Sequence, residues 1–174
     1  MLERSKILYS FRVIHRSMLF NDFQGFKTVK ELKKTGTDIV LNRKGVYLVI
    51  FNNKTQPIFL KQSIGGHFKG KDPSVSIEKL EYNWISDEEI VYIGQAGGNG
   101  SNATLRKRLK QYINFGSGKP VGHWGGRYIW QLEKSDDLII AWKETIQDPY
   151  VVESELIDKF REKHGKRPFA NLTK

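Results

Sequence analysis

The chain contains no cysteine, and this absence limits both its fold and its chemistry. Disulfides and zinc–thiolate sites are excluded, so the fold must hold together by packing alone. The four histidines are scattered and show no HxxxH or HExxH spacing, so a preformed zinc centre is not expected. An ion with oxygen ligands, such as Mg²⁺, is compatible with this composition.

Long apolar runs are also missing. None approaches the roughly 20 residues that a transmembrane helix requires. Met1–Ser10 alternates charged with apolar residues and lacks the apolar core of a signal peptide. These features predict a cytoplasmic protein without a membrane partner. The 174 residues, 39% of them hydrophobic, predict a single domain over 1–174 with an apolar core.

Acidic residues are the scarcer charged class. Lysine and arginine number 29 against 19 aspartates and glutamates, which gives a formal net charge of +10. A positive field of this size attracts polyanions and speeds their capture. Nucleic acid is therefore the expected partner, although a basic protein that binds no nucleic acid has the same composition.

Apolar periodicity and turn-forming residues divide the chain into expected elements. Strands are expected at Gly45–Phe51, Glu89–Gly94 and Leu138–Trp142, with weaker candidates at Pro57–Leu60 and Arg127–Leu132, the last with a helical alternative. Helices are expected at Thr28–Lys34, Ser76–Trp84, Leu105–Phe115 and from Asp148 to Gly165. Turns or loops are expected at Asn52–Lys54, Ile64–Pro73, Ala96–Thr104, Gly116–Gly126 and Ser135–Asp137. This mixture predicts an α+β fold, in which helices flank a small antiparallel sheet of about three core strands.

The last expected helix places a carboxylate on its apolar side. At about 100° per residue, one stripe carries Val152, Leu156, Ile157 and Phe160, and Glu153 falls near its middle. A carboxylate that faces a core is costly unless it is paired or binds a cation. Glu153 is therefore expected to have a partner, in either a structural salt bridge or a functional site.

The helix at Leu105–Phe115 follows a glycine-rich loop and is strongly basic. Arg108 lies at the edge of its apolar side, one turn from Tyr112. Its other cations are Arg106, Lys107 and Lys110. Such a run is usually a solvated face, but it also suits phosphate binding. The loop itself is not a Walker P-loop, because no GK[ST] follows it.

Two short motifs resemble the signatures of GIY-YIG nucleases. Gly45-Val46-Tyr47 is a conservative form of GIY, and Tyr92-Ile93-Gly94 is a literal YIG. Each lies in an expected strand, as the family requires. Leu105–Leu109 resembles the helical segment that carries the family's essential arginine, which is Arg108 here, and Tyr112 resembles a supporting tyrosine or histidine.

The resemblance continues to the end of the chain. Glu153 resembles the metal-binding glutamate of the family. Pro168 and Asn171 match a terminal P-x-x-N element, in which the asparagine supports the site. The resemblance places the catalytic core at 45–171, with an insertion at about 52–88 between the first two core strands. Residues 1–44 form an N-terminal flank without a counterpart in the minimal module.

The resemblance implies a restriction- or repair-like endonuclease that hydrolyses DNA phosphodiester bonds, with RNA as a further compatible substrate. Glu153 would hold Mg²⁺ or Mn²⁺, and Arg108 would place a permanent charge on the phosphate. Tyr47 or Tyr92 would act as general base, with a pKa lowered by Arg108 and the ion. Either tyrosine is equally compatible with a role as a core aromatic, and the choice between them stays open.

Residues outside the motifs complete the expected site. His123 is a candidate for proton transfer or phosphate contact, or is a structural loop histidine. The cations expected to contact DNA are Lys69, Lys71, Arg106, Lys107, Lys110, Lys119 and Arg127. Phe68 is a possible stacking or wedge residue. A homodimer would suit an enzyme that cuts both strands. The alternatives are an inactive nucleic-acid-binding module with the same fold and a structural or protein-interaction domain.

Overall fold

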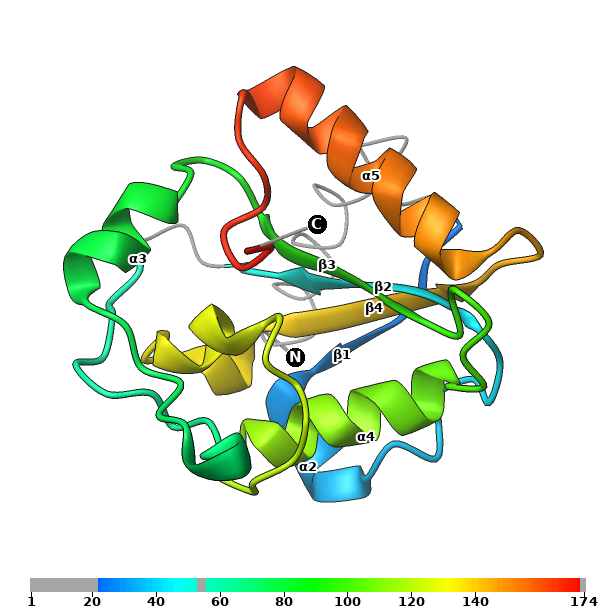
Figure 1. The fold of residues 1–174 in the computed structure, drawn as a ribbon, viewed down its shortest axis with the longest axis horizontal. Coiled ribbons are helices and arrows are strands. Elements are labelled where there is room, and N and C mark those ends of the chain that lie inside the picture. Colours follow the sequence, from blue (N-terminus) through cyan, green and yellow to red (C-terminus); the bar gives the residue numbers. More distant parts are fainter. Residues whose placement is uncertain (1–21, 53–55, 173–174) are drawn as a thin grey trace, which may run out of the picture.

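The computed structural model describes residues 22–52 and 56–172. The expectations for Met1–Ser10 and for a turn at Asn53–Lys54 fall outside these residues. The described chain has an α+β fold built on a four-stranded antiparallel sheet with strand order β1-β4-β2-β3 (Figure 1). The strands are β1 (Gln24–Thr28), β2 (Gly45–Ile50), β3 (Ile90–Ala96) and β4 (Ile139–Glu144). The α-helices are α2 (Val29–Thr35), α3 (Ile77–Asn83), α4 (Leu105–Phe115) and α5 (Pro149–His164).

The sheet is covered by helices on both faces. Figure 1 shows α5 on one face and α4 with α2 on the other. Every residue of β2 is buried, and alternate side chains enter two different apolar clusters. Val46 and Leu48 pack with Ile157 of α5, whereas Tyr47 and Val49 belong to the cluster that includes α4. The central strand therefore points one row of side chains, with Tyr47 among them, towards the basic helix α4.

The ends of the two long helices match the sequence expectation. Thr104 caps α4 by accepting from the amide of Lys107. Asp148 caps α5 by accepting from the amide of Tyr150. Gly165 ends α5 with φ of 68°, a conformation that favours glycine. Local capping chemistry thus fixes where both helices begin and where α5 ends.

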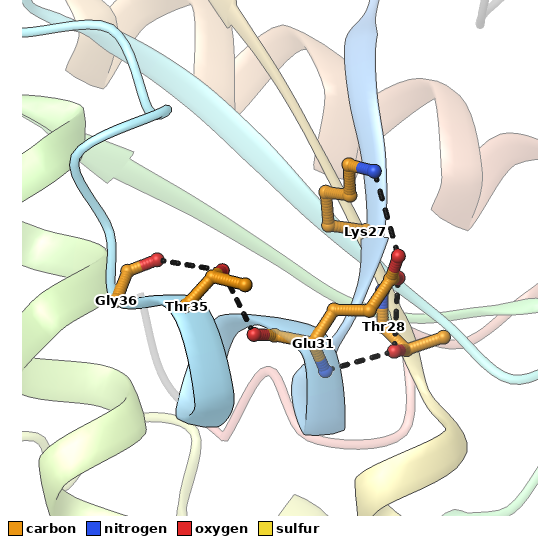
Figure 2. Close-up of polar contacts among 5 residues, drawn as sticks. All are labelled: Lys27, Thr28, Glu31, Thr35 and Gly36. Carbon is orange, nitrogen blue, oxygen red and sulfur yellow. Dashed lines mark hydrogen bonds and ion pairs between the residues drawn. The ribbon is translucent and has the colours of Figure 1, made fainter.

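Part of the N-terminal flank belongs to the sheet, which corrects the expectation of about three strands. β1 pairs with β4, and α2 follows it directly. Thr28 and Glu31 form a capping box, in which Glu31 accepts from the Thr28 amide and Thr28 Oγ1 accepts from the Glu31 amide (Figure 2). From the far end of α2, Lys33 reaches Asp136 at 2.6 Å. These contacts make the described flank a structural part of the domain.

Two expected strands do not form as such. Pro57–Leu60 contributes a single bridge, between Phe59 and Leu132. Arg127–Gln131 is a 3₁₀-helix, so its helical alternative describes it better. The carbonyl of Gln131 instead accepts from the amide of Leu60 at 2.7 Å. The β-prone apolar residues are buried in a tight helical turn, because interior packing outweighs strand propensity here.

The Ile64–Pro73 segment is less exposed than expected. Gly65 and Gly66 are buried, and the Gly66 amide donates to the Phe115 carbonyl at 2.8 Å. A Cβ on Gly66 would collide with the backbone of Lys119. The insertion is therefore packed tightly against the loop that follows α4. Among the described residues, no helix is long and apolar enough to cross a membrane.

Candidate functional site

The glycines of the two short motifs occupy positions that have no room for a side chain. Gly94 lies opposite Tyr47 in the β2–β3 register, and a Cβ on Gly94 would collide with the Tyr47 ring. A Cβ on Gly45 would collide with the Lys143 carbonyl of β4. Gly94 thus lets the Tyr47 ring lie across β3, towards the diagonal position occupied by Tyr92.

Three tyrosines and a histidine form one cluster beneath α4. The ring of Tyr47 lies 6.0 Å from that of Tyr92 and 6.1 Å from that of Tyr112, measured between centroids. The rings of Tyr92 and Tyr112 are stacked at 6.2 Å. His123 contacts Tyr112 edge-on at 4.6 Å. The cluster brings together residues of β2, β3, α4 and the loop that follows α4.

His123 is tied to the first motif. Its Nε2 lies 3.1 Å from Tyr47 Oη, and its side chain is buried. Burial, and then the positive charge of Arg108, lower the pKa of His123 to about 3. The ring is therefore neutral at physiological pH, and in the tautomer protonated on Nδ1 its Nε2 accepts a hydrogen bond from Tyr47 Oη. His123 Nδ1 and Tyr112 Oη have no hydrogen-bond partner within the described part of the chain.

The two motif tyrosines differ in their environments. Burial raises the pKa of Tyr47 well above its ordinary value. Burial and the charge of Glu153 raise the pKa of Tyr92 to about 12, while Arg108 and hydrogen bonding by Tyr47 oppose that rise. Tyr47 is fully covered and Tyr92 keeps 6% of its surface exposed. Tyr92 is thus the more accessible of the two hydroxyl-bearing residues.

Arg108 and Glu153 act on both tyrosines from different helices. The charge of Arg108 on α4 lowers the pKa of Tyr47 and of Tyr92, and the charge of Glu153 on α5 raises both. Two elements far apart in sequence thus bring an arginine and a carboxylate within electrostatic reach of the same pair of hydroxyls.

Glu153 is less buried than its helical position predicts. It is half-buried, as are Val152 and Leu156, and the stripe becomes fully buried only at Ile157 and Phe160. The sheet covers the middle of α5 more fully than its first turns. The helical period alone places Glu153 on the correct side but overstates its burial.

The side-chain cover next to Tyr92 has a gap at Gly125. Gly125 is exposed, and a Cβ placed on it would have a single neighbour within 4 Å, Tyr92 Oη at 3.6 Å. The next residue, Gly126, is buried against Tyr112 and Tyr92. Sequence patterns alone do not single out Gly125, because a glycine in a turn-rich loop predicts only a turn. The ring that lies beneath it comes from a distant strand.

Asn171 holds the edge strand that carries Tyr92. Its side-chain oxygen accepts from the Ile93 amide at 2.9 Å, and its side-chain nitrogen donates to the Ile93 carbonyl at 2.8 Å. The Ala170 amide adds a bond to the Val91 carbonyl at 2.8 Å. The Asn171 side chain therefore hydrogen-bonds both the amide and the carbonyl of Ile93, the residue after Tyr92. These bonds hold the strand segment that carries Tyr92.

The cations expected to contact DNA fall into two groups. The five lysines are exposed, whereas Arg106 and Arg127 are half-buried. Four of the seven cations also make contacts within the chain. Arg106 Nε donates to the Val40 carbonyl at 2.9 Å, and Lys119 Nζ donates to Asn114 at 3.2 Å. Lys69 lies over the Phe68 ring, and the Arg127 guanidinium lies over the Trp124 ring.

The half-buried carboxylate of Glu153 is the residue that would hold a metal. Mg²⁺ takes oxygen ligands and is commonly held by one or two carboxylates while it keeps several waters. A carboxylate whose charge already reaches the Tyr92 and Tyr47 hydroxyls fits that requirement. The described residues contain no group of three or more histidines, aspartates or glutamates that could hold an ion.

Comparison of the chain with family models, with curated proteins and with solved structures finds no match.

Proposed function

We propose that the chain is a metal-dependent endonuclease that hydrolyses DNA phosphodiester bonds with a site of the GIY-YIG type. The observation that carries this proposal is the convergence of β2, β3, α4 and α5 on one pair of tyrosines. Arg108 and Glu153 act electrostatically on both Tyr47 and Tyr92, and His123 contacts Tyr47 Oη. A phosphoryl site needs a fixed cation, a carboxylate and a proton acceptor in that proximity.

Arg108 would bind the scissile phosphate. It is half-buried at the edge of α4, and its guanidinium carries a permanent charge that can form two parallel hydrogen bonds to phosphate oxygens. Charge of this kind stabilises the extra negative charge that develops on the phosphate as water attacks. Glu153 would hold the divalent ion, which supplies further charge stabilisation and an acidified water when bound.

The proposal assigns the two tyrosines different roles. Tyr92 Oη lies next to exposed Gly125, so an attacking water can approach it. Tyr47 is fully buried and its hydroxyl contacts neutral His123, so it serves to orient Tyr92 and is not itself the base. Burial raises the pKa of Tyr92 to about 12 even with the opposing charge of Arg108. A bound cation would therefore have to lower this pKa further for Tyr92 to act as a base.

The experiment is plasmid nicking by the purified chain with Mg²⁺, Mn²⁺ or EDTA. We expect metal-dependent nicking that falls by about 10²–10³-fold in Arg108→Gln, the loss typical of one fixed charge donor. We expect a comparable or larger loss in Glu153→Gln. The matched control is Glu155→Gln, an exposed carboxylate on the same helix, which should cut normally. If cutting is equally strong in Glu153→Gln, the proposal is wrong.

A second measurement tests the metal site without relying on turnover. A ligand that binds only the folded state of a protein raises the melting temperature of that protein. We expect Mn²⁺ to raise that of the wild type and of Glu155→Gln, but not that of Glu153→Gln. An equal rise in all three would remove Glu153 from the metal site.

The alternative function is an inactive nucleic-acid-binding module with the same fold. The complete burial of Tyr47 and the raised pKa of both tyrosines favour it. This alternative predicts salt-dependent DNA binding that Arg108→Gln weakens, with no nicking of DNA or RNA under any metal. The nicking assay therefore separates the two functions directly.

A further inference from the structure

Trp124 occupies an unusual position in the loop Gly122–Gly126. It is partly exposed, whereas Trp130 and Trp142 are buried and Trp84 packs against other rings such as Phe169. The guanidinium carbon of Arg127 lies 4.7 Å from the centroid of Trp124 and 5.2 Å from that of Tyr128. Tyr128 is itself buried, so Arg127 links the Trp124 ring to the core. Within the described part of the chain, Arg127 lies over the Trp124 ring and no other aromatic ring packs against it.

The residues on both sides of Trp124 touch the candidate site. His123, immediately before it, contacts Tyr47 Oη at 3.1 Å. Gly125, immediately after it, lies over Tyr92 Oη, which is 3.6 Å from the point that a Cβ on Gly125 would occupy. Trp124 therefore lies in the chain between one residue that contacts Tyr47 and one that borders Tyr92.

A second aromatic–cation pair lies next to the same loop. The Phe68 ring of the insertion comes within 3.4 Å of a Cβ position at Gly122, and Lys69 Nζ lies 5.4 Å from the Phe68 centroid. Partly exposed rings bordered by cations are the features of surfaces that bind nucleic acid by stacking bases and neutralising phosphates. The net charge of +10 favours a polyanionic ligand here.

We propose that Trp124 is a stacking platform for an unpaired nucleobase beside the scissile phosphate, so that DNA with an unpaired nucleotide at the cleavage point is the preferred substrate. A base inside a duplex has both faces covered by its neighbours, whereas an unpaired base can place one face on Trp124. Arg127 and Lys69 lie where they can neutralise the adjoining phosphates. The inference rests on the proposed function and specifies the substrate of that same site.

The test measures binding in EDTA, so that it does not depend on hydrolysis. The probes are two labelled duplexes of one sequence, one fully paired and one with a single unpaired nucleotide. We expect the wild type to bind the second about tenfold or more tightly. Trp124→Leu should bind that probe about 5- to 100-fold more weakly, the range for losing one stacked base, and should bind the paired duplex almost unchanged. Trp124→Phe keeps an aromatic face and should retain most of the preference.

Tryptophan fluorescence of the wild type provides a readout that needs no destabilising variant. The unpaired probe should quench the emission more strongly than the paired duplex, and Trp124→Phe should remove that excess. Equal binding and equal quenching by the two probes would overturn the inference, as would equal weakening of both by Trp124→Leu.

The outcomes also distinguish this inference from the proposed function. Glu153→Gln should keep the preference for the unpaired probe, because the binding step uses no metal. A clear preference without nicking under any metal would leave the platform standing and refute the nuclease. Metal-dependent nicking by a protein with no preference would refute the platform alone.

Discussion

At the scale of single residues, Gly125 is the exposed position beside the Tyr92 hydroxyl, where the proposed function has the attacking water approach. A Cβ there would make ordinary contact with Tyr92 Oη at 3.6 Å, and Gly125 is not among the glycines with positive φ. Gly125→Ala should therefore fold normally. We expect Gly125→Val, whose larger side chain covers the hydroxyl, to lower nicking by about 10²-fold, as small displacements of reacting groups do. The measurement is single-turnover nicking at saturating metal.

The matched control for this prediction is Gly122→Ala. That residue is also exposed, but its Cβ would meet Phe68 at 3.4 Å and not a tyrosine. Its nicking rate should stay close to that of the wild type. Normal nicking by Gly125→Val, with an unchanged melting temperature, would mean that substrate does not approach Tyr92 through the Gly125 gap.

His123 makes stability depend on pH in a predictable direction. Burial lowers its pKa to about 3, below the roughly 6.5 of an unfolded chain, so between these values the unfolded state binds more protons. The stability that neutral His123 contributes is complete above about pH 6.5 and declines as pH falls towards 3. The slope approaches about 1.4 kcal/mol per pH unit. The difference in unfolding free energy between the wild type and His123→Gln should thus shrink between pH 7.5 and pH 5 in urea titrations.

The outcome that contradicts this prediction is a difference between the wild type and His123→Gln that stays constant from pH 7.5 to pH 5. That result would show that burial does not lower the pKa of His123 in the folded protein.

At the scale of elements, one buried side chain, that of Gln131, hydrogen-bonds two separate parts of the insertion. Gln131 Nε2 donates to the carbonyls of Leu60 and Val75, and its Oε1 accepts from the Val75 amide. Gln131→Leu would leave three part-buried backbone groups without these partners, at up to about 1–3 kcal/mol each. We expect a loss of about 3 kcal/mol or more in urea unfolding, with faster proteolysis between residues 57 and 75.

The control for Gln131 is Gln111→Leu, an exposed glutamine on α4. It should change stability by less than about 0.5 kcal/mol, as surface substitutions usually do. If Gln131→Leu is cleaved no faster than this control, the insertion is held in place by its apolar contacts and not by the glutamine.

Elements with local signals were predictable from the sequence, and those set by distant contacts were not. The bounds of α4 match because its cap and its apolar spacing lie within the segment itself. β1 was missed because it is a half-exposed edge strand, interrupted by Gly25 and by Phe26 with φ of 44°, and so shows no clean alternation. Arg127–Gln131 contains β-prone residues, yet packing against distant segments makes it helical.

The residues of the candidate site also divide into those that local sequence patterns identify and those that only distant contacts bring together. The motif residues Tyr47, Tyr92, Arg108 and Glu153 stand out in the sequence through short patterns and helical spacing. The contact of His123 with Tyr47 joins positions 76 residues apart, and the position of Gly125 over Tyr92 joins a loop to a distant strand. Such approaches depend on how the loop after α4 closes over the sheet, and no local pattern encodes that closure.

At the scale of the whole molecule, the net charge of +10 should make DNA binding steeply dependent on salt. Each cation that neutralises a phosphate contributes about −0.9 to the slope of log K against log salt. Lys107 and Lys110 are exposed on α4, the helix that carries Arg108. We expect Lys107→Gln and Lys110→Gln each to reduce the magnitude of that slope by about 1, without a change in melting temperature.

Two other cations test whether this salt dependence comes from binding at the α4 face or only from the net charge of the protein. Lys159 is exposed on α5, across the sheet from α4, so Lys159→Gln should leave the slope unchanged (Figure 1). Arg106 donates to the Val40 carbonyl, so Arg106→Gln should lower the melting temperature as well as affinity. If all four variants reduce the slope equally, DNA responds to the overall field and not to the α4 face. That result would leave the position of Arg108 as the remaining structural argument for where the phosphate binds.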